Sequence, residues 1–195
     1  LLAQPDLRGL NVTIPYKEAV LPFLDELNET AKAVGAVNTI RIRNGRLEGY
    51  NTDVIGFRDS LQPLIQPQHR QALILGTGGA AKAVAYALQQ LNLTYHFVSR
   101  TPAAGQLAYA ALDRDKMTEH LLIINTTPLG MAPDTGTCPD IPYEWLEPEH
   151  LLYDLVYHPE ETLFLKKGKA KGAMIKNGYE MLIKQAEAAW KIWNE

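Results

Sequence analysis

The chain has 195 residues and a formal net charge of −3 at pH 7, from 19 lysines and arginines against 22 aspartates and glutamates. Hydrophobic residues make up 46% of the chain, which excludes an intrinsically disordered protein because enough apolar surface is available to offset the entropy of ordering. The near-neutral charge gives no basic field for nucleic acid, and no run of about 18 apolar residues predicts a membrane span.

The first third of the chain predicts short strands and helices. A weak strand is expected over 10–14, and the apolar spacing of 17–27 predicts a helix that Pro22 breaks or delays. Asn28 is suited to cap a second short helix, and Gly35 is suited to end it in a left-handed conformation.

A β-hairpin is expected next. The segments Ile40–Arg43 and Arg46–Tyr50 flank the dipeptide Asn44-Gly45. This dipeptide is the strongest short signal for a hairpin, because both residues of the tight turn need positive φ. The two flanking segments are therefore predicted to pair as antiparallel strands.

After residue 53 the pattern changes to apolar strands separated by helices. A helix is expected over 53–64, and the Gln-Pro-Gln run at 66–68 is typical of a linker. Further strands are expected at 72–75, 96–98, 121–124, 151–156 and 173–175, with helices at 80–91 and 179–193. Because these strands are apolar without alternation, they predict a parallel sheet covered on both faces, in an α/β protein.

A glycine-rich turn follows the strand at 72–75 and opens the next helix. The turn contains Gly76, Thr77, Gly78, Gly79 and Ala80, and with Ala81 it has the G-x-G-x-x-A spacing. The first glycine permits a tight turn, and the second lets the backbone approach a pyrophosphate at the positive end of the helix. The turn is thus a candidate dinucleotide site, with a purely structural tight turn as the alternative.

The end of the next strand bears on which dinucleotide binds. Folds that bind NAD usually place an acidic residue there for the ribose hydroxyls. This chain has Ser99, Arg100 and Thr101 instead. A guanidinium pairs with a 2′-phosphate that a carboxylate would repel, so NADP is favoured over NAD. An exposed Arg100 without a binding role is the alternative.

Polar clusters in the first third lie at strand ends or in loops, where binding residues concentrate. They are Asn11–Lys17, Gly35–Thr39 and Gly49–Asp53. Lys17 and Asp53 offer an acid–base pair, and the uncharged amides and hydroxyls suit a polyol substrate. Taken singly, each cluster is also explained by helix caps, turns or an exposed lysine.

These segments resemble the shikimate dehydrogenase family, which reduces 3-dehydroshikimate with NADPH, and the resemblance covers residues 8–193. Its motifs are NVTIPYK at 11–17, GAVNT at 35–39, NTD at 51–53, GTGGA at 76–80, NTTPLGM at 125–131, YDLVY at 153–157, and Asn177-Gly178 followed by Met181, Leu182 and Gln185. The resemblance implies an α/β fold of two domains. We expect a small substrate domain over 1–57 that lacks its N-terminal strands, a Rossmann-like NADP-binding domain with a parallel sheet over 58–177, and a returning C-terminal helix over 178–195.

The resemblance also implies roles for individual residues. Lys17 is expected to be the catalytic proton donor and acceptor, with Asp53 beside it. The substrate hydroxyls are expected to bind Thr13, Asn38, Asp53, Tyr157 and Gln185. The cofactor pyrophosphate is expected on Gly76, Thr77, Gly78, Gly79 and Ala80, the 2′-phosphate on Ser99, Arg100 and Thr101, and the nicotinamide against Leu155 and Gly178.

The chain departs from the family pattern at two places. The family's N-terminal strand carries a Ser-x-Ser that grips the substrate carboxylate, and it is absent, so we expect a further segment to precede Leu1. The chain as printed is expected to bind NADPH but to turn over shikimate poorly or not at all. The loop Pro102–Gly105 also lacks a basic residue that many members place there, which weakens the expectation of strict NADP selectivity.

The favoured interpretation is an NADP-dependent shikimate dehydrogenase of chorismate and aromatic amino-acid biosynthesis. Two alternatives stay open, a quinate/shikimate dehydrogenase of broader specificity and a non-catalytic nucleotide-binding paralogue. Lys17 and Asp53 argue against the paralogue, because a pure binder needs no acid–base pair. A small-molecule substrate is expected, with no nucleic acid or membrane partner, as a monomer or homodimer.

Cysteine and histidine usage adds two expectations. The lone cysteine, Cys138, excludes an internal disulfide framework and favours a cytoplasmic protein. The five histidines are scattered without ligand-like spacing, so no metal site is predicted.

Overall fold

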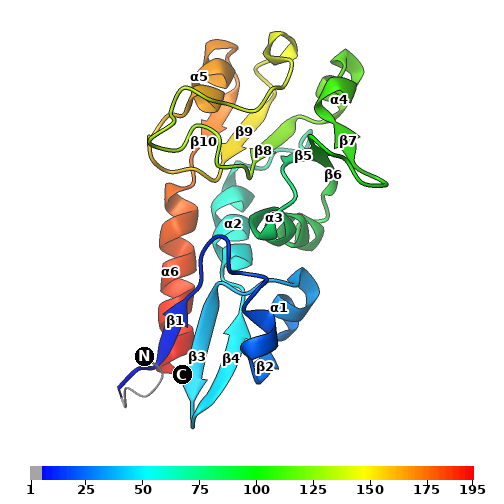
Figure 1. Cartoon of the computed structure of the whole chain (residues 1–195). Helices are drawn as coiled ribbons and strands as arrows, with labels where there is room; N and C mark the ends of the chain where they lie inside the picture. Colours follow the sequence, from blue (N-terminus) through cyan, green and yellow to red (C-terminus); the bar gives the residue numbers. More distant parts are fainter. Residues whose placement is uncertain (1–5) are drawn as a thin grey trace.

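The computed structural model describes residues 6–195, which form two sheets connected by helices (Figure 1). The smaller sheet has the strand order β1-β3-β4-β2, with β1 (Gly9–Asn11), β2 (Glu26–Leu27), β3 (Thr39–Arg43) and β4 (Arg46–Tyr50). The larger sheet has the order β10-β9-β8-β5-β6-β7, with β5 (Gln71–Leu75), β6 (Thr94–Ser99), β7 (Leu107–Ala108), β8 (Leu122–Asn125), β9 (Leu151–Asp154) and β10 (Met174–Lys176). The α-helices are α1 (Glu29–Val34), α2 (Asp53–Leu61), α3 (Gly79–Gln90), α4 (Arg114–Glu119), α5 (Leu163–Ala170) and α6 (Tyr179–Asn194).

Local turn and cap chemistry shapes the smaller sheet as predicted. The side chain of Asn28 accepts a hydrogen bond from the Ala31 amide at 2.8 Å, and Gly35 ends α1 with φ of 68°. Asn44 and Gly45 have φ of 52° and 75° and connect β3 to β4 in an antiparallel hairpin. The predictions of helix α1 and of the hairpin are therefore confirmed.

The helix predicted over 17–27 was wrong. Only a single 3-10 turn forms at Leu21–Phe23, with Pro22 in its first positions, and β2 then pairs in parallel with β4. The Asp25 amide donates to the Leu47 carbonyl at 2.9 Å, so the chain after the turn joins the sheet. The apolar residues that suggested a helix, Val20, Leu21, Leu24 and Leu27, pack against the small core of Ala31, Val37 and Ile40. Tertiary packing overrides the helical spacing here.

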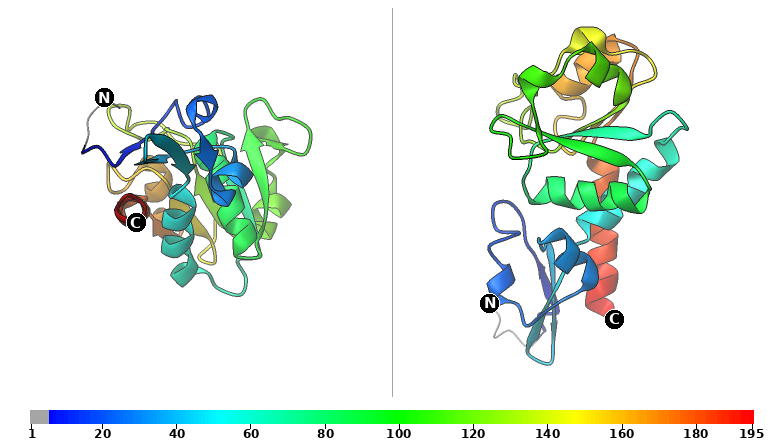
Figure 2. Two further views of the ribbon diagram at one scale, coloured as in Figure 1. Left: turned by 90° about the horizontal axis from the view of Figure 1, so that it is seen from below. Right: turned by 90° about the vertical axis from the view of Figure 1, so that its right-hand side faces the viewer.

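The neighbouring strands of the larger sheet are all parallel, and apolar side chains project from both of its faces. Ala72 and Ile74 of β5 lie in the core beneath α2 and α3, whereas Leu73 and Leu75 lie in a second core with side chains of α4 and α5. Helices accordingly cover both faces (Figure 2). This confirms the predicted parallel sheet and explains the absence of alternation along its strands.

Helices α2 and α6 connect the two sheets. Helix α2 begins directly after β4 and packs along α6, and α6 runs from the larger sheet back to the smaller one (Figure 2). There the indole Nε1 of Trp193 donates to the carbonyl of Ile40 at 3.0 Å. The division at residues 57 and 177 stays a prediction. None of the helices between residues 6 and 195 is long and apolar enough to cross a membrane.

Phe57 of α2 is the side chain whose removal we expect to weaken the fold clearly. It is fully buried, and its ring meets that of Tyr153 edge-on with centroids 5.0 Å apart. The Phe57→Ala cavity should lower the free energy of unfolding by about 3–5 kcal/mol. Phe23 is 75% exposed, so Phe23→Ala should change the free energy of unfolding by less than about 0.5 kcal/mol. Urea denaturation of both variants checks this, and equal small changes would contradict the packing described.

Candidate active site

Lys17 and Asp53 form an ion pair that joins the turns after β1 to the start of α2. Lys17 lies in the turns after β1, and its carbonyl accepts a hydrogen bond from the Val37 amide at 2.8 Å. Asp53 is the first residue of α2. The Lys17 Nζ and Asp53 Oδ2 atoms are 2.6 Å apart, and the two side chains are 15% and 9% exposed. The structure thus brings together the two residues predicted to be catalytic.

Asn38 fixes the orientation of the Asp53 carboxylate. Its Nδ2 donates to Asp53 Oδ1 and to Thr52 Oγ1, both at 2.9 Å, while its Oδ1 accepts from the Thr52 amide at 2.7 Å. The two oxygens of Asp53 therefore accept from different donors, one from an amide and one from an ammonium. This arrangement leaves the carboxylate little freedom to rotate away from Lys17.

Gln185, on the C-terminal helix α6, belongs to the same cluster. Its Oε1 lies 3.4 Å from both Asn38 Nδ2 and Thr52 Oγ1, and its Nε2 donates to the Leu182 carbonyl at 3.0 Å. Lys17, Asn38, Asp53 and Gln185 thus meet although they come from four separate segments of the chain. Thr52 also belongs to this network, although no role was predicted for it from the sequence. Its place beside Asp53 in the NTD motif is the signal that could have indicated one.

The other two predicted substrate residues, Thr13 and Tyr157, lie on the surface. Thr13 is exposed in the turn before Lys17, and Tyr157 is 49% exposed in the loop after β9. Within residues 6–195, no hydrogen bond connects either side chain to the Lys17–Asp53 cluster. Their predicted role in hydroxyl binding stays a prediction.

The glycine-rich turn after β5 leaves the start of α3 open. Gly76 has φ of 108°, a conformation that favours glycine, and its amide donates to the Val98 carbonyl at 2.9 Å. Within the described part of the chain, Gly78 precedes α3 without a side-chain cap, and a Cβ there would meet nothing within 4 Å. Backbone N–H groups at an uncapped helix start suit an anion, so these residues fit the pyrophosphate of a dinucleotide.

The glycine-rich turn also lies beside the ion pair. A Cβ built on Gly79 would stand 3.6 Å from the Cβ of Lys17, so the start of α3 faces the turn that carries the lysine. The neighbouring Glu18 forms an ion pair with Lys82 of α3, with 2.8 Å between Oε2 and Nζ. The candidate dinucleotide site and the acid–base pair are therefore adjacent.

Strand β6 pairs in parallel with β5 and ends at Ser99, and Arg100 and Thr101 follow it. The Thr101 amide donates to Ser99 Oγ at 3.2 Å, and Arg100 is exposed. Burial raises the pKa of the Tyr109 hydroxyl, and the nearby Arg100 guanidinium offsets part of the rise. Because the carboxyl ends of parallel strands share one edge, Arg100 lies on the same edge of the sheet as the glycine-rich turn.

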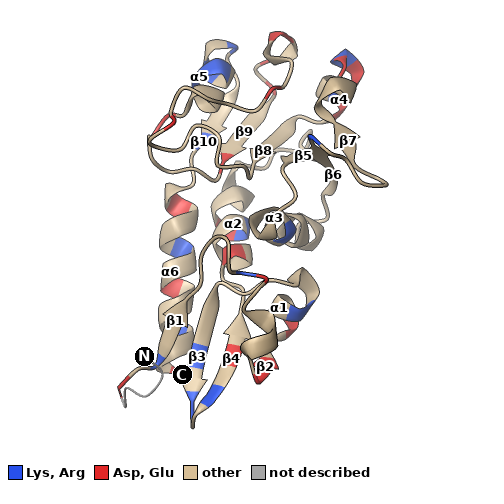
Figure 3. Ribbon diagram, in the orientation of Figure 1, with Lys and Arg blue, Asp and Glu red and all other residues tan. Residues whose placement is uncertain are grey.

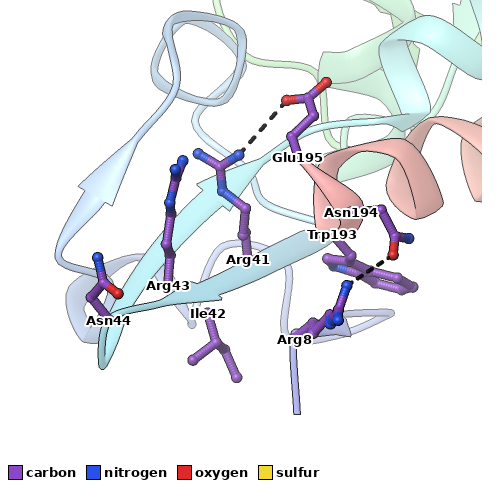
Figure 4. Close-up of a pocket in the computed structure, with 8 residues that line it drawn as sticks. All are labelled: Arg8, Arg41, Ile42, Arg43, Asn44, Trp193, Asn194 and Glu195. Atoms are coloured by element: carbon purple, nitrogen blue, oxygen red, sulfur yellow. Dashed lines mark hydrogen bonds and ion pairs between the residues drawn. The ribbon is translucent and has the colours of Figure 1, made fainter. Parts of the chain in front are cut away.

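Two surface hollows lie away from this cluster. One, of about 600 Å³, is lined by Ala186, Glu187, Trp190 and Lys191 of α6. The other, of about 310 Å³, lies between the basic end of the β3–β4 hairpin and the end of α6 (Figures 3 and 4). Two of its guanidinium groups have partners: Arg41 pairs with Glu48 at 2.6 Å, and Arg8 donates to Asn194 at 3.2 Å. Neither hollow contains a predicted site residue.

The buried histidines have structural partners. His150 Nε2 lies 3.0 Å from the carbonyl of Met117, and His69 Nε2 lies 3.0 Å from that of Glu149. Over residues 6–195, no group of three or more histidine, cysteine, aspartate or glutamate side chains could hold a metal ion.

Comparison with known proteins identifies close relatives. The family described as "Shikimate dehydrogenase substrate binding domain" matches residues 1–40. The chain is 39% identical over 208 residues to shikimate dehydrogenase (NADP(+)) of Desulforamulus reducens, covering 96% of this chain and 72% of that relative. The structure of shikimate 5-dehydrogenase from Thermus thermophilus, in complex with NADP(H) and shikimate, matches with a TM-score of 0.85 at 38% identity, covering 97% and 74% of the two chains. Quinate dehydrogenase from Corynebacterium glutamicum, in complex with NAD, matches with a TM-score of 0.84 at 32% identity, covering 96% and 73%.

Proposed function

The chain belongs to the shikimate dehydrogenase family, and we propose that Lys17 and Asp53 form the acid–base centre of its reaction. The protein is an NADP-dependent oxidoreductase of the shikimate pathway that interconverts 3-dehydroshikimate and shikimate. When bound, the cofactor supplies or accepts the hydride. The observation that carries the proposed roles is the 2.6 Å contact between Lys17 Nζ and Asp53 Oδ2, next to the open start of α3.

Lys17 acts on the oxygen at which the substrate is reduced. In the reductive direction, negative charge develops on the ketone oxygen, and the Lys17 ammonium delivers its proton there. In the oxidative direction, the Lys17 Nζ atom takes the proton back from the hydroxyl. Asp53 holds that nitrogen in place through Oδ2, because Asn38 fixes the other carboxylate oxygen.

We assign substrate binding to the amides and hydroxyls around this pair. Ring hydroxyls both donate and accept hydrogen bonds, so they suit Asn38, Gln185 and the Asp53 carboxylate, which the structure gathers in one network. Thr13 and Tyr157 are assigned to the same role by the family resemblance, and their exposed side chains leave them accessible to a ligand.

The cofactor is assigned to the edge of the larger sheet. Gly76–Ala80 hold the pyrophosphate, Ser99–Thr101 hold the 2′-phosphate, and Leu155 and Gly178 line the nicotinamide end. A Cβ on Gly178 would lie 2.1 Å from the Leu155 carbonyl oxygen, so the two backbones touch and a larger residue at 178 would displace the loop. This contact supports a shared role for the pair.

The two alternatives are less well supported. A non-catalytic paralogue would have no use for the Lys17–Asp53 pair, whose geometry is suited to proton transfer. A quinate/shikimate dehydrogenase differs in the hydroxyls of its ring substrate. The experiment that separates the three is turnover of shikimate and of quinate with NADP⁺ by the full-length enzyme: a clear preference for shikimate is expected, and no turnover of either would support the paralogue.

Arg100 is expected to provide NADP selectivity. Loss of a charge-assisted phosphate contact costs about 1.5–3 kcal/mol, so Arg100→Ala should weaken NADP binding about ten- to a hundred-fold and leave NAD binding almost unchanged. Isothermal titration with both dinucleotides measures this. Arg70 immediately precedes β5, at the end of the strand opposite the glycine-rich turn. It provides a control because Arg70→Ala should change neither affinity. Equal losses for NADP and NAD in Arg100→Ala would contradict the assignment.

We further assign the protein to the cytoplasm, as a monomer or homodimer without a nucleic-acid or membrane partner. The slight net charge of −3 and the single cysteine support this assignment.

A further inference from the structure

Asp154 is a buried carboxylate at the edge of the larger sheet where ligands bind in folds of this kind. It is the last residue of β9, and the sheet register pairs it with Asn125, the last residue of β8. Both side chains are completely buried. Neither has a part in the proton transfer, hydroxyl binding or phosphate binding described above, so their place at this edge needs another explanation.

The two oxygens of Asp154 connect three separate segments. Oδ1 accepts from Asn125 Nδ2 at 2.9 Å and from the Val156 amide at 3.0 Å. Oδ2 accepts from Thr162 Oγ1 at 2.6 Å, and Thr162 is the residue that caps α5. One carboxylate therefore holds the end of β8, the loop after β9 and the start of α5 together.

The segment most closely controlled by these contacts is the loop Leu155–Tyr157. The Leu155 amide donates to the Asn125 carbonyl at 3.0 Å, and the Val156 carbonyl accepts from the Gly178 amide at 3.2 Å. On the other side, the Leu155 carbonyl lies against Gly178 so closely that a Cβ there would be 2.1 Å away. The loop is fixed between β8 and the start of α6.

Ionisation of the Asp154 carboxylate is costly in the folded protein. Burial raises the pKa of Asp154 from 3.8 to about 6, against the opposing hydrogen bonds from Thr162, Val156 and Asn125. The folded protein thus binds this proton more tightly than the unfolded chain, and the free energy of unfolding decreases as the pH rises from 3.8 to about 6. A buried carboxylate with a raised pKa at a ligand-binding edge of a sheet is a candidate for a functional position.

We infer that Asp154 is a positioning residue, which holds the loop Leu155–Tyr157 in the shape that receives the nicotinamide end of NADP. The inference rests on the proposed assignment of Leu155 and Gly178 to the nicotinamide. It places no atom of Asp154 in contact with substrate or cofactor. Asp154 acts through the Val156 amide and through Asn125.

The test uses the full-length enzyme and two ligands that share the adenosine end. NADPH carries the nicotinamide, whereas adenosine 2′,5′-bisphosphate lacks it. In Asp154→Asn, the loop loses its charge-assisted acceptor, so NADPH should bind about ten- to a hundred-fold more weakly while adenosine 2′,5′-bisphosphate binds as in the wild type. Isothermal titration gives both affinities. The thermal unfolding midpoint should change little, because asparagine has nearly the same size as aspartate and the cost of burying a charge is removed while the contacts to the loop weaken.

Two further variants separate positioning from a general loss of structure. Asp113→Asn alters an exposed carboxylate between β7 and β8, which caps α4 by accepting from the Lys116 amide at 2.8 Å, and should change neither affinity. Asp154→Ala removes every acceptor, so it should lower the unfolding midpoint and weaken NADPH binding more than Asp154→Asn does, still with little change for adenosine 2′,5′-bisphosphate.

Three results would overturn the inference. Equal losses for both ligands in Asp154→Asn would show a general structural role. A lower unfolding midpoint in Asp154→Asn with NADPH binding unchanged would likewise show a structural role. Wild-type affinities for both ligands in Asp154→Asn would show that the loop does not depend on the carboxylate. A wild-type enzyme that binds neither ligand would instead contradict the proposed function, and the inference would fail with it.

Discussion

Replacing Lys17 with methionine is expected to lower kcat by about 10²–10⁴-fold while KM changes little. Methionine keeps the length of the side chain and removes both charge and proton. Negative charge on the substrate oxygen develops only as the hydride arrives, so the lysine stabilises the transition state more than the bound ketone.

Steady-state kinetics of the full-length enzyme with shikimate and NADP⁺ provide the measurement. Lys32 on α1 is exposed and belongs to the same part of the fold, so Lys32→Met is the matched control and should keep the wild-type kcat. A Lys17→Met enzyme with near-normal kcat would leave the reaction without its proton donor.

Replacing Asp53 with asparagine should produce a different kinetic pattern. The amide can keep the Asn38 contact through one oxygen, but it then presents a donor to the Lys17 ammonium, where Oδ2 now accepts at 2.6 Å. The lysine loses its orientation, and the substrate loses a charged hydrogen-bond partner. We expect kcat/KM to fall about 10²–10³-fold, with KM increased about tenfold as part of the loss.

The same kinetic assay distinguishes this from a loss of helix structure. Asp59 lies on the same helix, is 38% exposed and, among residues 6–195, forms an ion pair with its neighbour Arg58 at 2.8 Å and with no other residue. Asp59→Asn should therefore keep both kinetic constants. A fall in kcat for Asp53→Asn with no change in KM would argue against its role in binding the substrate hydroxyl.

Features that depend on local chemistry could be predicted from the sequence. Asn28 and Gly35 bound α1, and Asn44-Gly45 form the hairpin turn, because a capping side chain or a positive φ is required at those positions. Unbroken apolar runs likewise predicted the parallel sheet. The prediction of a helix over 17–27 was wrong because the apolar spacing of a helix also suits a looped segment that packs on the smaller core.

The candidate site was predictable to the extent that its residues stand in recognisable motifs. Lys17, Asn38, Asp53 and Gln185 meet as the resemblance implied, although their contacts span up to 147 positions in the sequence. Asp154 was not predicted to have a role, since nothing in the letters Tyr-Asp-Leu shows that the strand register places Asn125 opposite it. Long-range register and burial decide such a role, and neither is visible in a single sequence.

The most direct test of the acid–base centre is a double-mutant cycle of kcat with Lys17→Met, Asp53→Asn and the double variant. If Asp53 contributes to proton transfer by holding Lys17, its removal costs little once the lysine is gone. We therefore predict that kcat of the double variant lies within about threefold of that of Lys17→Met alone, because residues that act as a unit are strongly non-additive. Losses that multiply, with each substitution lowering kcat by the same factor in either background, would show that the two residues act independently and would contradict the account.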